Sequence, residues 1–246
     1  MPDLTILHTN DLHGKMSKRA MEIIKSSCDK CLLLDAGDAV SSGNIYYRPG
    51  GEPMLARMSD LGYDAMAMGN REFHFLSQGL KSKVKLARFP VLSANIRSNN
   101  LDISTSVQPS LTLEIGGFRI ALFGLTVPMI TKHMFASKIS PYWFEDPITA
   151  AQEIVPNLRE NADLLIALTH IGLQADMELA STVPGIDLIV GGHTHAILND
   201  PVVVDRTFIV QAGCWGNFLG KVEITKLAAP FDIRETLIDL REHRNG

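Results

Sequence analysis

Side chains that commonly bind divalent metals recur in this sequence, each directly after an apolar run. They are Asp11, His13, Asp38, Asn70, His170, His193 and His195. Asp11 and His13 stand two residues apart, and in an extended chain such residues point to the same side. Imidazoles and carboxylates are good ligands for divalent ions. Because open α/β sheets bind ligands beyond the carboxyl ends of their strands, we expect five loops to converge on one metal site.

Seven candidate ligands are too many for one ion and suit two, with one carboxylate shared. Two ions about 4 Å apart can hold the attacking and leaving oxygens of a phosphoryl displacement and bring the pKa of a bound water near neutral. The shared position requires a carboxylate, which offers two charged oxygens, and we assign it to Asp38. Each motif alone is more often structural, since Gly-Asp after a strand is commonly a turn. Their joint occurrence at strand ends favours the metal site.

The elements that must position these residues alternate between strands and helices in the first half of the chain. We expect helices at residues 17–27, 52–61, 78–87 and 147–160, the third with one solvated face, and an aromatic loop at 141–144. The expected strands are 4–8, 31–34, 65–68, 89–93, 111–115, 118–123, 164–168, 188–190, 202–204, 208–210 and 222–224, with 236–240 as an edge strand. Alternation indicates parallel β-α-β units, whereas short connections between later strands indicate antiparallel pairing. The pattern therefore predicts a mixed, two-layer sheet with flanking helices, and His8 as a hydrogen-bonded core histidine.

Composition sets broad limits on partners and location. The chain has 246 residues, of which 46% are hydrophobic and 20% charged, and a single domain over residues 1–246 is expected. A net charge of −4 without a basic patch argues against nucleic acid as a structural partner, although it allows a small nucleotide substrate. There is no apolar run near the roughly 18 residues of a membrane span and no signal peptide, so we expect no membrane association and a cytoplasmic location. The oligomeric state is not predicted.

The order of these motifs resembles the calcineurin-like metallophosphoesterase superfamily. Asp11-x-His13, Gly37-Asp38, Gly69-Asn70, His170 and Gly192-His193-Thr194-His195 carry the resemblance. Further stretches resemble the 5′-nucleotidase and 2′,3′-cyclic-nucleotide phosphodiesterase branch, and the resemblance covers nearly the whole chain. These stretches are residues 6–14, 90–96, 123–126, 168–172, 211–213 and 219–220.

The resemblance implies an α/β fold, a four-layer α/β/β/α sandwich with mixed sheets, around a dinuclear centre. By the family pattern, Asp11, His13 and His195 hold one ion, Asn70, His170 and His193 hold the other, and Asp38 bridges. Family metals are typically Mn, Zn, Fe, Co or Ni. The usual nucleotidases of this branch carry a second, C-terminal domain that binds the base. This sequence ends at Gly246, so we expect the catalytic domain only, without that nucleotide-binding domain.

One motif departs from the family pattern. Gly-Asn-His-(Glu/Asp) reads Gly69-Asn70-Arg71-Glu72 here, and the family's histidine protonates or stabilises the leaving group. Arginine stays protonated in proteins, so Arg71 cannot act as an acid, but it can bind substrate and stabilise charge on phosphoryl oxygens. His74 either donates the proton instead or is a supporting histidine. Asn95 either binds substrate or caps a loop.

These observations predict a hydrolase that uses metal-bound hydroxide on phosphate mono- or diesters, with nucleotides or cyclic nucleotides as plausible substrates. Two alternatives remain open. Part of this branch hydrolyses a sulfur–sulfur bond, and the altered catalytic histidine makes that chemistry relevant. A non-catalytic metal-binding scaffold is the other alternative, although it would predict weakened ligands and all seven ligand types are present.

Overall fold

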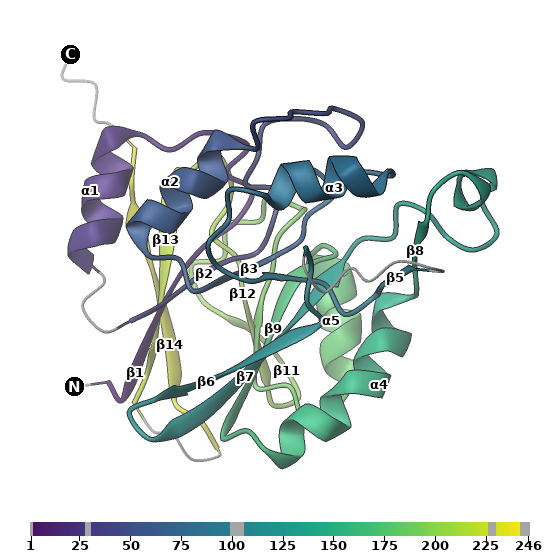
Figure 1. The fold of residues 1–246 in the computed structure, drawn as a ribbon. Helices are drawn as coiled ribbons and strands as arrows, with labels where there is room; N and C mark the ends of the chain where they lie inside the picture. The colour runs from purple at the N-terminus through teal and green to yellow at the C-terminus, as the bar shows by residue number, and fades with distance from the viewer. Residues whose placement is uncertain (1, 28–30, 99–105, 226–229, 242–246) are drawn as a thin grey trace.

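Two sheets packed face to face form the centre of the protein (Figure 1). The computed structural model describes residues 2–27, 31–98, 106–225 and 230–241. Within these ranges each large sheet has six strands, and helices cover both outer faces. The layers therefore run helix, sheet, sheet, helix, as predicted.

The first sheet has the order β14-β13-β1-β2-β3-β4. Its strands are β1 (Leu4–Thr9), β2 (Leu32–Asp35), β3 (Ala65–Ala67), β4 (Val91–Leu92), β13 (Phe218–Ile224) and β14 (Ile233–Asp239). The strands β1 to β4 are parallel, whereas β13 is antiparallel to β1 and to β14. The carboxyl ends of the four parallel strands consequently lie at one edge, where Asp11, Asp38 and Asn70 follow β1, β2 and β3.

The second sheet has the order β11-β12-β10-β9-β7-β6. Its strands are β6 (Ser110–Ile115), β7 (Phe118–Thr126), β9 (Leu164–His170), β10 (Leu188–Val190), β11 (Val202–Val204) and β12 (Thr207–Val210). The predicted antiparallel pairing of the later strands is correct for β11 and β12 but wrong for β10 and β12, which are parallel. The reason is that β11 runs back along the sheet edge, so β12 can re-enter beside β10 without a crossover helix.

Alternation along the strands divides the apolar core into three layers. In β1, Ile6 faces the space between the sheets and Leu7 faces the helices, and in β9 Ile166 and Leu165 divide in the same way. This period of two is what a strand buried on both faces requires, since successive side chains point to opposite faces. The alternation of apolar residues therefore lets each sheet pack against the other sheet on one face and against helices on the opposite face.

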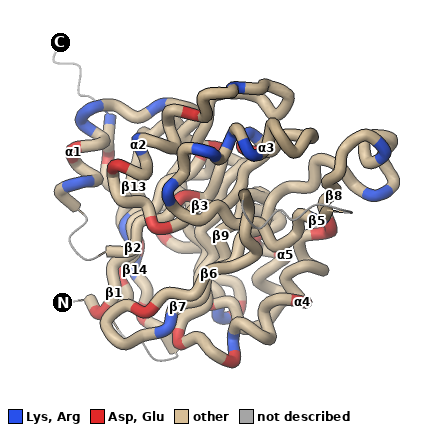
Figure 2. The backbone as a smooth tube through the Cα atoms, in the orientation of Figure 1, with Lys and Arg blue, Asp and Glu red and all other residues tan. Residues whose placement is uncertain are grey.

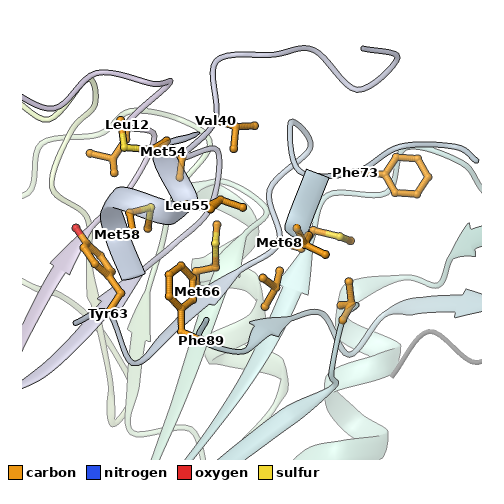
Figure 3. Close-up of a cluster of buried hydrophobic side chains, with 14 of the residues drawn as sticks. Leu12, Val40, Met54, Leu55, Met58, Tyr63, Met66, Met68, Phe73 and Phe89 are labelled. Carbon is orange, nitrogen blue, oxygen red and sulfur yellow. The ribbon is translucent and has the colours of Figure 1, made fainter. Parts of the chain in front are cut away.

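Helices α1 (Lys18–Ser27), α2 (Pro53–Leu61) and α3 (Ser77–Val84) pack on the first sheet, and α4 (Pro147–Glu160) and α5 (Leu173–Thr182) pack on the second. Figure 3 shows methionines of α2 against Met66 of β3. Gly62 ends α2 with φ of 84°, the left-handed conformation expected of a C-cap. Helix α5 was not predicted, because its N-cap Gly172 has no side chain to signal a helix start.

Two local predictions need correction. Residues 141–144, predicted as an aromatic loop, include strand β8 (Tyr142–Phe144), which pairs with β5 (Ile96–Ser98). Its alternation turns Tyr142 and Phe144 toward the ring of Phe73, with centroids 6.2 and 5.0 Å away. Figure 2 shows basic residues along α3, and the sequence predicted that this helix has a solvated face. Lys83 is instead fully buried, because polar atoms of neighbouring loops surround its ammonium group.

Among the described residues, no helix combines the length and apolar character that crossing a bilayer requires. The cytoplasmic location stays a prediction. His8 is confirmed as a core histidine, since it is buried and its Nε2 lies 3.0 Å from Glu235 Oε1.

Candidate metal centre

The predicted ligands meet at the common carboxyl edge of the two sheets. The loop after β1 lies along the loop after β2, where Asp11 N–H donates to Gly37 O at 2.9 Å and His13 N–H donates to Asp38 O at 2.9 Å. The loop after β10 joins them because His193 N–H donates to Asp11 Oδ2 at 2.9 Å. Backbone contacts therefore join the first two loops, and the Asp11 carboxylate draws in the third.

Most of these residues have a strained backbone. Five of the seven non-glycine residues with positive φ in the described chain are predicted ligands, with φ between 50° and 78°. They are Asp11, His13, Asp38, His193 and His195. Residues with a Cβ seldom adopt this conformation, and such strain concentrates at functional sites. The strain therefore marks the same residues that the spacing of the sequence singled out.

Asp11 lies at the centre of the cluster. Its Oδ1 is 3.3 Å from His195 Nε2, 3.7 Å from His13 Nε2 and 4.0 Å from His170 Nε2. Asp38 Oδ1 lies 3.5 Å from the same His170 atom. Two groups of candidate ligands result, Asp11 with His13 and His195, and Asp11 with Asp38 and His170. Asp11 is common to both groups, and the bridging role of Asp38 stays a prediction.

Several ligand atoms are buried without a hydrogen-bond partner among the described residues. They are Asp11 Oδ1, His13 Nδ1, Asn70 Oδ1 and His170 Nε2. A buried polar atom left unpaired costs about 1–3 kcal/mol, so native proteins rarely tolerate several together. Carboxylate and amide oxygens with imidazole nitrogens are a donor set for a divalent transition metal. The residues present therefore fit metal ions.

The histidines of the site differ in how readily they lose a proton. His170 Nδ1–H donates to Ala36 O at 2.7 Å, which directs the lone pair of Nε2 toward the carboxylates. Burial opposes protonation of His170, but the charges of Asp38 and Asp11 outweigh it and raise its pKa to about 9 in the metal-free protein, so an ion that binds Nε2 must displace a proton. Burial lowers the pKa of His13 and His193, which favours the neutral imidazole that binds metal.

Two glycines permit this close approach of the loops. A Cβ on Gly69 would lie 2.3 Å from Asp38 N, and one on Gly192 would lie 2.7 Å from Ala36 O and 2.9 Å from His170 Nδ1. Any side chain at these positions would push the ligand loops apart.

Glu72 anchors the Asp38 loop, a role that was not predicted from the sequence. It is fully buried, and its carboxylate accepts backbone N–H groups of Asp38 at 2.9 Å, Gly69 at 2.9 Å and Val40 at 3.1 Å. Burial, and then the charge of Asp38, raise the pKa of Glu72 to about 7. Its place directly after Asn70-Arg71 was the only available signal.

Arg71 lies beside Asp38, and its catalytic and substrate-binding roles stay predictions. Its N–H donates to Asp38 Oδ1 at 2.7 Å, its Nε lies 3.5 Å from Asp38 Oδ2, and the side chain is partly exposed. Beneath it, Lys83 Nζ donates to Arg71 O at 2.6 Å, Gly43 O at 2.7 Å and Ser42 Oγ at 2.8 Å. Burial lowers the pKa of Lys83. The guanidinium therefore sits beside the carboxylates on a backbone that a buried ammonium holds in place.

His74 and Asn95 have other partners. His74 is buried, its Nδ1 accepts Leu76 N–H at 3.0 Å, and a Cβ on Gly79 would lie 2.1 Å from that atom, so the ring packs against α3. Asn95 is also buried. Its amide donates to Thr126 O at 2.7 Å and Glu145 O at 3.1 Å, and its Oδ1 accepts Thr126 N–H at 2.9 Å. These contacts join Asn95 to loops rather than to the cluster, and catalytic or substrate-binding roles for both residues stay predictions.

Two amides that the sequence analysis did not assign hold the ligand loops. Asn10 donates to Asp11 Oδ2 at 2.8 Å and accepts Ala212 N–H at 2.9 Å. Gln211 Oε1 accepts Ala196 N–H at 3.1 Å and the Thr194 hydroxyl at 3.1 Å. Residues 211–213 contributed to the family resemblance, so the sequence did single out Gln211, but it did not indicate what the residue does.

Several known proteins are similar to this chain in sequence or fold. The chain is 35% identical to the trifunctional nucleotide phosphoesterase protein YfkN of Bacillus subtilis, over 90% of this chain and 18% of that protein. It is 33% identical to a snake venom 5′-nucleotidase of Naja atra, over 91% of this chain and 50% of that protein. The crystal structure of a 5′-nucleotidase precursor from Thermus thermophilus matches 96% of this chain and 54% of its own, with a TM-score of 0.79 and 26% identity. The chain thus spans half or less of the length of these curated relatives.

The family model of the calcineurin-like phosphoesterases matches residues 4–196. That range contains every predicted ligand, from Asp11 to His195, and both sheets contribute to it. The chain therefore belongs to the calcineurin-like phosphoesterase family.

Proposed function

We propose that this chain hydrolyses phosphate mono- or diesters with two divalent metal ions held at the edge of the sheets. The observation that carries the proposal is the convergence of buried, unpaired ligand atoms around Asp11 Oδ1 and His170 Nε2. Asp11, His13 and His195 would hold one ion, Asn70, His170 and His193 the other, and Asp38 would bridge. Bound ions of this kind lower the pKa of water and withdraw charge from phosphoryl oxygens.

The protein's own residues would supply positioning and charge. The Arg71 guanidinium, partly exposed beside Asp38, is placed to bind an anionic phosphoryl group and to stabilise the charge that develops on its oxygens. Arg71 remains protonated and cannot donate a proton to the leaving oxygen. The site therefore favours esters whose leaving group departs as a stable anion.

Nucleotides or cyclic nucleotides are the proposed substrates. Support comes from relatives named as nucleotide phosphoesterase and 5′-nucleotidase, with identities of 35% and 33%. The chain spans only part of each relative, and the candidate metal centre accounts for binding of the phosphoryl group of such a substrate.

The test compares three esters with the manganese-loaded chain: p-nitrophenyl phosphate, bis-p-nitrophenyl phosphate and AMP. We expect hydrolysis of the aryl esters, two ions per chain by elemental analysis, and weaker activity on AMP because its ribose alkoxide needs a proton. Comparable activity on AMP would show that a proton donor exists, and His74→Ala would then test that residue. Turnover of no ester with metal bound would overturn the proposal and leave the sulfur–sulfur hydrolase, whereas a folded chain that purifies metal-free and takes up no manganese would favour the scaffold.

A further inference from the structure

Trp215 stands in an unusual place beside the candidate metal centre. Its backbone N–H donates to the carbonyl oxygen of Asp11 at 2.8 Å, which ties it to the loop that carries the first ligands. Its φ is 60°, a left-handed conformation that a bulky residue rarely adopts. The backbone of the loop therefore keeps this side chain beside the candidate metal centre despite the cost of the left-handed conformation.

The indole ring lies at the exposed rim of the site. Its centroid is 6.2 Å from the ring of His195 at an interplanar angle of 62°, and Lys15 Nζ lies 4.7 Å from it. The side chain is nevertheless 48% exposed. Packing against its own domain thus uses only part of a ring that would contribute most to stability if it were buried.

These facts together point to a ligand. A strained backbone holds a large aromatic ring half in solvent, next to a metal-ligating histidine and under a lysine ammonium. Aromatic faces stack on planar rings, and such stacking tolerates different ring identities. Lys15 adds a positive charge near the same spot, which suits a substrate with anionic groups.

We infer that Trp215, assisted by Lys15, binds the planar aromatic leaving group of the phosphate ester. This inference rests on the proposed function, because it concerns the organic side of an ester whose phosphoryl group lies at the metal centre. It assigns substrate preference to a residue on the His195 side of the site, whereas Arg71 acts beside Asp38. Aromatic esters are accordingly preferred over aliphatic esters of similar charge.

The kinetic experiment compares p-nitrophenyl phosphate with glycerol 2-phosphate in the manganese-loaded chain. Trp215→Ala should raise KM for the aryl ester by roughly 5- to 150-fold, the range of base–aromatic stacking, and change kcat/KM for glycerol 2-phosphate less than about twofold. Trp215→Phe should restore most of the preference, and Lys15→Gln should raise KM by about 2- to 5-fold. Trp215→Asn, which tolerates the left-handed backbone, serves if the alanine variant does not fold.

The chain offers a matched control pair. Phe135 is 72% exposed on the short helix η1 (Phe135–Lys138), with Lys138 Nζ 5.7 Å from its ring. Phe135→Ala and Lys138→Gln should leave both esters unchanged. Equal effects of the Trp215 and Phe135 variants, or an unchanged aryl preference in Trp215→Ala, would overturn the inference while leaving ester hydrolysis intact.

Binding is measured separately by fluorescence, so that loss of hydrolysis and loss of stacking can be told apart. The sequence contains two tryptophans, and Trp143→Phe leaves Trp215 as the single emitter. Adenosine should quench this emission in a saturable way, whereas ribose should not. An active enzyme without saturable quenching would refute the ring-binding role, and quenching in a chain that hydrolyses no ester would refute the proposed function alone.

Discussion

Replacing Lys83 by methionine tests how much the site depends on the residues beneath it. The ammonium is fully buried and donates to three carbonyl oxygens and the Ser42 hydroxyl. Methionine keeps most of the volume but leaves Ser42 O and Arg71 O without the donor that they have here, while Gly43 O keeps Tyr46 N–H at 3.1 Å. Each buried polar group left unpaired costs about 1–3 kcal/mol, so two such carbonyls cost about 2–6 kcal/mol. We therefore expect a loss of about 2–6 kcal/mol in the free energy of unfolding.

Urea unfolding followed by circular dichroism, with EDTA present to remove metal, measures this loss. Lys81→Met is the matched control because Lys81 lies on the same helix and is exposed, so its change should stay within about 0.5 kcal/mol. Lys83→Met should also raise KM for p-nitrophenyl phosphate in the manganese-loaded enzyme, because the Arg71 backbone loses its hydrogen bond to Lys83. A Lys83→Met variant as stable as Lys81→Met would refute the idea that the ammonium holds these loops.

Further predictions concern the ligands and a buried acid. Asp38→Asn should lower bound metal below two ions per chain and abolish ester hydrolysis; full metal content with full activity would contradict its assignment. Arg71→Met should lower kcat/KM for p-nitrophenyl phosphate by about 10²–10³-fold, the effect of losing one donor to a developing oxyanion, without changing metal content by elemental analysis. Burial raises the pKa of Asp176 to about 7, above its unfolded value near 3.8. The folded protein therefore loses stability as pH rises between these two values, because the buried carboxyl must ionise. Between pH 5 and 7.5 the free energy of unfolding of the wild type should therefore fall by about 2–3 kcal/mol relative to that of Asp176→Asn. Thermal or urea unfolding at both pH values measures this difference, and an equal pH dependence of the two proteins would contradict the prediction.

The periodic part of the fold was predictable, because it depends on local spacing. Leu4, Ile6 and Leu7 alternate as a strand buried on both faces must, and Gly62 ends α2 as expected. Pairing direction was harder, since the short connections around β11 are compatible with both a hairpin and a return along the sheet edge. Strand β8 was read as a loop because a three-residue strand carries too little alternation to distinguish it from an aromatic turn.

The convergence of the candidate ligands was predictable for a related reason. Once strands are parallel, their carboxyl ends share an edge, so Asp11 and Asp38 had to lie near each other whatever the helices did. Buried polar supports such as Glu72 and Lys83 could not be found this way. Their roles depend on loop backbones that converge from different strands, and nothing in the spacing of charges along α3 distinguishes Lys83 from the exposed Lys81.

Strain explains why these supports are needed. Five ligand residues have positive φ, and a non-glycine residue in such a conformation costs about 1–3 kcal/mol. A domain is stable by only about 5–15 kcal/mol in total, so this strain persists only where other contacts leave the backbone no alternative. Asn10 fixes Asp11, Glu72 fixes the backbone of Asp38, and Gln211 fixes the loop between His193 and Ala196. The ligand geometry is thus imposed by hydrogen bonds outside the ligand set, which is why substitutions at Glu72 or Gln211 should loosen the centre without removing a ligand.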